Sequence, residues 1–357
     1  MAKITAYEVS GAVDYSKIIK EFGVKQLETG PDFYMFRRRI AFAHRDFDLF
    51  FSRLAGPSAI VCGRGPSENV HLGHLVPYLL VKYFHDKYNT KVYIPFSDDE
   101  KYFARKLELE QVEKYALENA LDILALGFSP EKTKIVLDFK HIGHYYKYAA
   151  LFAKRTTFST VKGIFGFSES TNIGLIFYPA LQTTHIMLPF LEEKIENILV
   201  IVGIDQDPYM RLVRDLAAEL SMPKPASLYV KYLPPLTGLE GKMSASNPSS
   251  AIYLTDNEET VKRKLKNAVT GGAKSLEEQK KYGGNPEKCT VYFYFYFLCP
   301  DDSRIEKIYQ ECRTGERTCK ECKEELAEFL LQFLSEHRQR KEEIKERLKE
   351  YFLYKES

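Results

Sequence analysis

Short apolar runs alternate with longer amphipathic stretches along the middle of this chain. The runs have the length and the aliphatic content of buried strands, at residues 59–62, 91–96, 134–137 and 197–204. After its first residue the last run is wholly apolar, as expected of a central parallel strand that is covered on both faces. Helical patterns at residues 75–84 and 111–127 separate the runs. This alternation predicts an α/β fold built on a doubly wound parallel sheet, with ligands at the carboxyl ends of the strands.

The pattern becomes helical and charged from about residue 255. An apolar stripe at helical spacing runs through Leu326, Phe329, Leu330, Phe333 and Leu334 and continues to Ile344, Leu348 and Phe352. Such a stripe is typical of the core of a helical bundle. Near the start of the chain, Arg37, Arg38 and Arg39 are three adjacent bases, a pattern typical of a solvated face.

Composition limits the classes of protein that fit. A length of 357 residues allows about two domains, and a net charge of +2 means that any nucleic acid must bind a local basic patch. The first residues have no apolar signal core, and no run of eighteen apolar residues occurs, so we expect a soluble, cytoplasmic protein without a membrane span. Six cysteines in a chain of this size do not suggest a secreted disulfide framework.

The most informative stretch is the turn between the first strand and its helix, residues 63–74. Gly63 and Gly65 relax the backbone where a strand-turn-helix unit places ligand phosphates. His71 and His74, three residues apart, face the same way from the start of a helix. A Gly-x-Gly or a His-x-x-His pair is weak by itself, because surface pairs and metal-site fragments have the same pattern.

A second segment, Lys-Met-Ser-Ala-Ser at residues 242–246, changes that assessment. His-Leu-Gly-His followed far downstream by Lys-Met-Ser-Ala-Ser resembles the two signatures of class I aminoacyl-tRNA synthetases. Further motifs follow in the same order as in archaeal and eukaryotic tryptophanyl-tRNA synthetases, namely GRGPSENVHLGHL, SDDEKYF, KGIFGF, YPALQ, GIDQDPYMR and LTGLEGKMSASNPSSAIYLTD. The chain is similar to that family from about residue 5 to about residue 350.

The resemblance implies a Rossmann-like catalytic domain and a reaction. The enzyme would use ATP and Mg²⁺ to convert tryptophan to its adenylate, release pyrophosphate, and transfer the amino acid to tRNA(Trp). It also implies a homodimer and three parts of the chain: an N-terminal segment at 1–55 packed on the catalytic domain, the catalytic domain at 56–254 with a dimer-forming insertion around 140–195, and an anticodon-binding domain at 255–357. There, Arg338, Arg340 and Lys341 are candidates for phosphate contact or simply a solvated face.

The resemblance also assigns nucleotide contacts. Gly73 lets adenine lie against the backbone, His71 and His74 reach phosphate oxygens, and Lys242 stabilises the pyrophosphate in the transition state. The other expected ATP-binding residues are Gly63, Arg64, Asp205, Met243, Ser244 and Ser246. Gly238 and Gly241 would let the second signature close over ATP.

Amino-acid recognition is assigned in the same way. Glu100, Gln206 and Gln182 would hold the α-ammonium group, although Glu100 is also placed to form a structural salt bridge. Val61 and Pro95 stand where most relatives carry polar groups that reach the indole N–H. An unpartnered buried N–H costs roughly 1–3 kcal/mol, so we expect another acceptor, and His185, one turn past Gln182, is the candidate. Its alternative role is packing against neighbouring helices.

Four cysteines, Cys289, Cys312, Cys319 and Cys322, have the spacing C-x22-C-x6-C-x2-C. Some tryptophanyl-tRNA synthetases hold a [4Fe–4S] cluster with this spacing. Four thiolates suit such a cluster or a tetrahedral zinc ion, and free thiols are the third possibility.

Three other functions remain open on the sequence. One is a related synthetase for another aromatic amino acid, tyrosine first, although the tyrosyl enzymes carry Tyr and Asp where this chain has Val61 and His185. Another is a synthetase-like paralogue with a binding or regulatory role, against which the intact signatures argue. The third is a nucleotidyltransferase that acts on a cofactor, which shares the His-x-Gly-His turn but gives no reason for the second signature.

Overall fold

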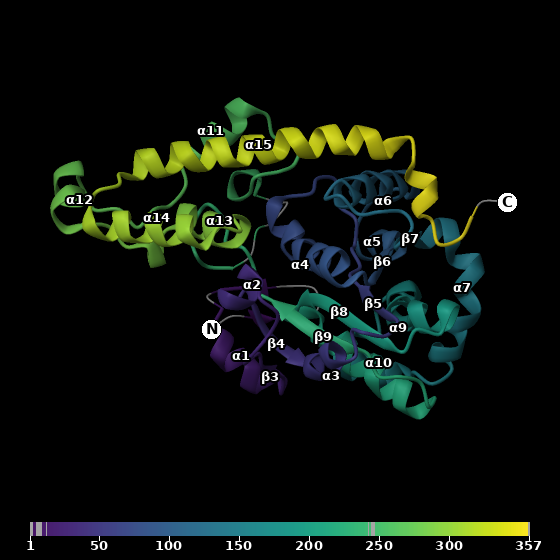
Figure 1. The fold of residues 1–357 in the computed structure, drawn as a ribbon. Coiled ribbons are helices and arrows are strands. Elements are labelled where there is room, and N and C mark those ends of the chain that lie inside the picture. The colour runs from purple at the N-terminus through teal and green to yellow at the C-terminus, as the bar shows by residue number, and fades with distance from the viewer. Residues whose placement is uncertain (1–2, 5–8, 12, 242, 244–246, 356–357) are drawn as a thin grey trace.

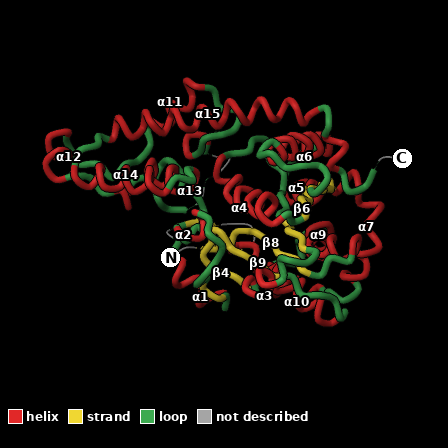
Figure 2. The backbone as a smooth tube through the Cα atoms, in the orientation of Figure 1, coloured by secondary structure: helices red, strands yellow, loops and turns green. Residues whose placement is uncertain are grey.

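The centre of the molecule is one seven-stranded sheet between two layers of helices (Figures 1 and 2). This computed structural model describes residues 3–4, 9–11, 13–241, 243 and 247–355. The strand order is β3 (Lys25–Gln26), β4 (Ala41–Arg45), β9 (Ala226–Val230), β8 (Asn197–Gly203), β5 (Ser58–Val61), β6 (Lys91–Phe96) and β7 (Thr133–Leu137). Strands β9 to β7 are mutually parallel, and β3 and β4 extend the sheet antiparallel. The predicted α/β parallel sheet is confirmed.

The sheet and the helices around it form the half of the molecule to which the resemblance assigns catalysis, the catalytic half. Its helices alternate with the strands as expected. They are α1 (Tyr15–Phe22), α2 (Tyr34–Arg37), α3 (Phe47–Ser52), α4 (Leu72–Tyr88), α5 (Asp98–Ala104), α6 (Leu109–Leu124), α7 (Asp138–Ala153), α8 (Phe158–Phe165), α9 (Ile173–Glu193) and α10 (Asp207–Glu219). A short two-stranded sheet, β1 (Lys3–Ile4) and β2 (Val9–Ser10), precedes them.

The helices of the C-terminal half lie to one side of the sheet (Figure 1). They are α11 (Glu258–Lys266), α12 (Leu276–Tyr282), α13 (Thr290–Leu298), α14 (Asp302–Thr314) and α15 (Cys319–Lys345). Four single turns of 3-10 helix complete the described chain, at Ile204–Gln206, Pro248–Ser250, Pro286–Lys288 and Leu348–Tyr351. No helix in the described ranges combines the length and the apolar character needed to cross a membrane.

Side-chain alternation along β5 shows how the two faces of the sheet are used. Ile60 packs into the hydrophobic core that also contains α4 and α6, whereas Ala59 and Val61 pack into the core formed with α7, α9 and α10. A strand buried on both faces needs apolar side chains at every position, which explains its unbroken apolar run. Val61 therefore lies on the face that α9 covers.

Arg38, directly after α2, connects the two halves of the molecule. Arg38 is buried, its Nη1 donates to the carbonyl oxygens of Tyr296 and Cys299, and its guanidinium pairs with Asp302. The expectation of a solvated basic face is therefore wrong for Arg38. Its carbonyl and carboxylate partners lie far away in the sequence, so local charge pattern gave no sign of them.

Candidate active site

The residues expected to bind substrate lie at the carboxyl ends of β5, β6 and β8. The chain passes from β5 outward to β6 and β7 and then returns on the other side of β5 with β8, so the strand order reverses between β5 and β8. A crevice forms at such a reversal because the loops on its two sides diverge. Gly63, Glu100, Asp205 and Gln206 all follow these strand ends.

The loop after β5 is held by backbone and side-chain hydrogen bonds. Arg64 N donates to the Pro95 carbonyl oxygen (2.9 Å), and Ser97 N donates to the Arg64 carbonyl oxygen (2.9 Å). Arg64 Nε donates to Asn119 Oδ1 at 2.7 Å, and Asn119 Nδ2 donates to the Ser67 carbonyl oxygen at 2.7 Å. The Arg64 guanidinium is thus fixed beside the turn, with Asn119 as its anchor.

Two histidines form the start of α4. The rings of His71 and His74 are stacked with centroids 3.4 Å apart, and His71 N donates to His74 Nδ1 at 3.3 Å. Arg64 Nη2 lies 3.2 Å from the same His74 nitrogen. Two imidazoles and a guanidinium therefore gather at the amino end of a 17-residue helix, where the helix dipole favours phosphate.

The described part of the second signature packs against this helix start. A Cβ atom added to Gly73 would lie 3.0 Å from Met243 Sδ, so the two segments approach as closely as glycine permits. Met243 is buried, and the chain just beyond it pairs with the first signature, because Leu72 N donates to the Ile252 carbonyl oxygen at 3.0 Å. Segments about 170 positions apart in the sequence are therefore in contact. Lys242, Ser244 and Ser246 lie outside the described residues.

Glu100 lies on the first turn of α5 and faces the loop after β5. Its Oε2 pairs with Lys101 Nζ at 2.9 Å, and the side chain is buried. A Cβ atom added to Gly65 would lie 2.3 Å from Lys101 Cε and 3.3 Å from Glu100 Oε2. The end of the Lys101 side chain therefore lies against Gly65, beside the Glu100 carboxylate.

One face of α9 supplies polar groups to the same region. Tyr178, Gln182 and His185 follow each other at helical spacing, and the Tyr178 hydroxyl hydrogen-bonds Ser97 Oγ (2.8 Å) and the Gln182 side-chain oxygen. Burial first, and the negative charge of Glu100 next, raise the pKa of Tyr178 well above its ordinary value. Tyr178 therefore remains a neutral hydroxyl between β6 and Gln182.

The end of β8 carries the third group of predicted residues. Asp205 is buried, and its Oδ1 accepts a hydrogen bond from the Tyr232 hydroxyl at 3.0 Å. The half-buried Gln206 follows it directly and ends the short 3-10 turn before α10. A Cβ atom at Gly203 would lie 2.5 Å from Asp205 Oδ1, so this carboxylate folds back over its own strand end.

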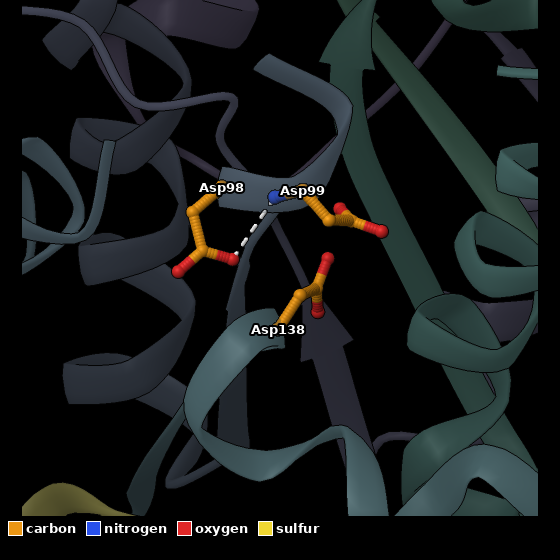
Figure 3. Close-up of side chains that lie close together, drawn as sticks. All are labelled: Asp98, Asp99 and Asp138. Atoms are coloured by element: carbon orange, nitrogen blue, oxygen red, sulfur yellow. Dashed lines mark hydrogen bonds between the residues drawn. The ribbon is translucent and has the colours of Figure 1, made fainter. Parts of the chain in front are cut away.

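Three buried carboxyl groups, Asp98, Asp99 and Asp138, lie close together at the starts of α5 and α7 (Figure 3). An oxygen from each lies within 4.8 Å of the others. Burial raises the pKa of Asp98 and of Asp138 to about 7 and raises that of Asp99 well above its ordinary value. His185, wholly buried, contacts Asp138 through Nε2 at 2.8 Å, and burial lowers its pKa to about 4.

Comparison with known proteins decides the family. The profile of the tRNA synthetases class I (W and Y) matches residues 53–335. The chain belongs to this family of class I synthetases. A tryptophan–tRNA ligase of Pyrobaculum aerophilum is 48% identical over 340 residues, which cover 91% of this chain and 90% of that protein. The predicted resemblance to archaeal-type enzymes of the family is confirmed.

Solved structures of the family have the same fold. A tryptophanyl-tRNA synthetase from Encephalitozoon cuniculi, bound to tryptophan, is 33% identical with a TM-score of 0.87 over 96% of this chain and 98% of its own. The enzyme of the archaeon Aeropyrum pernix K1 is 32% identical with a TM-score of 0.85 over 93% of this chain and 94% of its own. The whole described molecule, including its helical C-terminal half, is therefore shared with these synthetases.

The four spaced cysteines of this synthetase line one cavity away from the strand ends. Cys289 precedes α13, Cys312 lies in α14, and Cys319 and Cys322 begin α15. Glycines form part of the wall, since a Cβ atom at Gly272 would lie 2.4 Å from Cys319 Sγ. Burial raises the pKa of Cys322 to about 12, so its thiol is protonated in this cavity, whose lining also includes Arg317.

Several residues of the site were not predicted from the sequence. Asn119, Tyr178, Asp99 and Asp138 anchor or surround the predicted groups, yet each lies within a helical pattern or at the end of a strand. Asn119 did carry a signal, because it is a polar residue on the apolar face of an amphipathic stretch and is fully buried. The carboxyl cluster carried none, because Asp138 comes from a different strand end than Asp98 and Asp99.

Proposed function

We propose that this chain is a tryptophan–tRNA ligase, which activates tryptophan with ATP and Mg²⁺ and transfers it to tRNA(Trp). The contact of Met243 with Gly73 carries this proposal, since it joins the two nucleotide signatures over the strand ends. The named relatives support tryptophan as the amino acid. Enzymes with these substrates work in the cytoplasm, where we place this one.

The first step needs positioning and charge, and no protein nucleophile. The tryptophan carboxylate attacks the α-phosphorus, and pyrophosphate leaves on the opposite side. Negative charge grows on the phosphate oxygens at the amino end of α4, and Mg²⁺ neutralises part of it. Residues of the two signatures and of β8 would bind the nucleotide, namely Gly63, Arg64, His71, Gly73, His74, Asp205, Lys242, Met243, Ser244 and Ser246. We assign transition-state stabilisation to His71, His74 and Lys242.

The amino acid would occupy the region between β5, α5 and α9. The carboxylate of Glu100 and the amides of Gln182 and Gln206 are the groups for its α-ammonium. Val61 would contact the indole ring, because it lies on the sheet face that α9 covers. His185 on α9 is the group for the indole N–H.

ATP–pyrophosphate exchange with tryptophan, tyrosine and phenylalanine tests the reaction and the substrate together. We expect exchange with tryptophan only. Exchange with tyrosine would reassign the substrate, and exchange with none, together with no binding, would support a regulatory paralogue. Binding is directly readable, because the chain contains no tryptophan and the ligand is the only indole emitter.

The cysteine cavity suits a [4Fe–4S] cluster better than zinc. Four sulfurs at 2.3 Å from one zinc ion lie about 3.8 Å apart. Among the described residues no three cysteine sulfurs lie within 4.8 Å of one another, although all four line the cavity. A cluster binds each thiolate to a different iron, so its sulfurs stand farther apart. Its role here would be to join α13, α14 and α15.

Metal analysis of anaerobically purified protein tests this assignment. We expect about four irons and four sulfides per chain, with broad visible absorption. Cys322→Ser should lose the absorption, while Cys62→Ser, at a cysteine outside the cavity, should keep it. One zinc per chain would assign the site to zinc, and no metal would leave four free thiols.

A further inference from the structure

Asp138, the first residue of α7, is a buried carboxyl group on which several side chains converge. Its Oδ1 contacts the Tyr145 hydroxyl at 2.5 Å and His185 Nε2 at 2.8 Å. Its other oxygen, Oδ2, is buried and has no hydrogen-bond partner among the described residues, and the carboxyl groups of Asp98 and Asp99 lie within 4.8 Å of Asp138 (Figure 3). The reaction described above uses neither Asp138 nor Asp99.

The Tyr145 hydroxyl fixes the role of Asp138 Oδ1. Burial raises the pKa of Tyr145 well above its ordinary value, so the hydroxyl keeps its proton and donates it to Asp138 Oδ1. Asp138 Oδ1 is thus an acceptor. It therefore accepts a hydrogen bond from both Tyr145 O–H and His185 Nε2–H.

This arrangement determines the tautomer of His185. A neutral imidazole with its proton on Nε2 has a lone pair on Nδ1. Within the described parts of the chain, that Nδ1 is buried and has no hydrogen-bond partner, although the His185 side chain is wholly inaccessible to solvent. An unpartnered buried acceptor is costly unless a ligand supplies the donor.

We propose that Asp138 is a positioning residue that holds His185 as the Nε2–H tautomer, so that His185 Nδ1 accepts the indole N–H of tryptophan. The inference rests on the proposed function and deepens it. It explains how the indole N–H is satisfied although Val61 and Pro95 are apolar. Tyr145 acts through Asp138, and neither of these two residues touches the substrate.

A tryptophan analogue in which sulfur replaces the indole N–H isolates this one hydrogen bond. β-(Benzothiophen-3-yl)alanine has nearly the same shape but no donor. Dissociation constants and KM in pyrophosphate exchange should favour tryptophan over the analogue by roughly 5- to 100-fold in the unaltered enzyme. Equal affinity would overturn the proposal, because no acceptor would then be in use.

Asp138→Leu should reduce this preference to about onefold, mainly by raising KM for tryptophan, with KM for the analogue little changed. His185→Phe should do the same. The matched control is Asp98→Leu, which removes a buried carboxyl of the same cluster that makes no bond to His185. It should keep the preference for tryptophan. A preference that survives Asp138→Leu, or one that Asp98→Leu also abolishes, would refute the specific role of Asp138.

Nitrogen NMR of the unaltered protein labelled in its eight histidines gives a test that needs no variant. His185 should show a protonated Nε2 and an unprotonated Nδ1. The Nδ1 resonance should shift when tryptophan binds and should not change when the analogue binds. A protonated Nδ1 would overturn the proposal. Absence of tryptophan activation by the unaltered enzyme would instead refute the proposed function, so the two failures are distinguishable.

Discussion

Gly73 shows how one missing side chain joins two distant signatures. Its Cα hydrogens face both Met243 Sδ and the His71 ring, at 3.0 and 3.1 Å from where a Cβ would stand. The resemblance assigned Gly73 a contact with adenine. The structure shows a second reason for a glycine at this position, the close approach of Met243. A residue with a side chain here would separate the segments that meet over ATP.

Gly73→Ala should therefore lower kcat/KM for ATP by about 10²-fold in pyrophosphate exchange, because the added methyl displaces Met243 and His71 from their positions. Thermal unfolding should change little. Gly143→Ala is the matched control, since nothing lies within 4 Å of the added Cβ and the residue is inside α7. It should stabilise the protein by about 0.5–1 kcal/mol and leave activity unchanged. Equal activity loss in both variants would contradict this account.

Buried carboxyl groups make stability depend on pH in a direction that can be worked out. Burial raises the pKa of Asp98 to about 7 in the folded protein, so the folded state holds a proton that the unfolded chain releases near pH 4. The stability that this proton provides is present below pH 4 and is lost as pH rises toward and through 7.

Asp98→Asn removes this loss. Urea titration at each pH gives the free energy of unfolding of Asp98→Asn minus that of the unaltered protein. This difference should increase by roughly 2–4 kcal/mol from pH 5 to pH 8. The control variant Glu324→Gln, on the exposed side of α15, should leave the pH dependence of the free energy of unfolding unchanged. A difference between Asp98→Asn and the unaltered protein that stays constant with pH would show that Asp98 is ionised throughout.

Helix α15 connects the C-terminal half to the catalytic half. It begins at Cys319 in the cysteine cavity and runs along the molecule to α6 (Figure 1). Its basic residues, which the sequence left open between phosphate contact and solvation, make internal bonds: Arg340 Nε donates to the Ala125 carbonyl oxygen at 2.8 Å, and Lys341 Nζ pairs with Asp122 at 2.6 Å. These bonds anchor the helix to the catalytic half.

Lys341→Met should destabilise the protein by about 2–4 kcal/mol, because it leaves the buried Asp122 carboxylate without its cation. Adding Asp122→Asn should restore much of the loss. Lys345→Met, one turn further along and paired with the exposed Glu342 at 3.9 Å, should cost less than about 0.5 kcal/mol. Denaturant unfolding compares the three, and equal losses for Lys341→Met and Lys345→Met would show that Asp122 does not need its partner.

At the scale of the whole molecule, exposed apolar side chains occur at several places, and two of them lie on the neighbouring helices α7 and α9. Ile173, at the start of α9, is 82% exposed, and Tyr146 on α7 is 56% exposed. Both lie in the insertion around 140–195 that the sequence associated with a dimer. We propose that these side chains are covered by a second copy of the chain, since exposed apolar groups on adjacent helices are typical of interfaces.

Ile173→Glu should shift the protein from dimer to monomer in light scattering, because the interface would have to bury an unpaired charge. Leu276→Glu is the control, since Leu276 on α12 is also exposed, at 56%, but lies outside the insertion. It should leave the dimer intact. If the unaltered protein is monomeric, this interface does not exist. If the dimer survives Ile173→Glu, its interface lies elsewhere on the chain.

The sequence by itself determined the class of fold, the family and the positions of four strands of the central sheet. Strands β5, β6, β7 and β8 were predicted because buried parallel strands need continuous apolar runs, a requirement that acts locally. Strand β4 was missed, since its Ala-Phe-Ala-His-Arg pattern is short and partly polar and becomes a strand only through pairing with β9. The order of the motifs identified the family, because motif order can be read from the sequence without any three-dimensional information.

Only the tertiary structure decided which side chains meet. The Asp138–His185 contact joins α7 and α9, and Arg38, directly after α2, reaches a carboxylate on α14. The four thiols came together from three helices. Such contacts depend on how elements pack across long separations in sequence, whereas hydrophobic periodicity records only the face on which each element is buried.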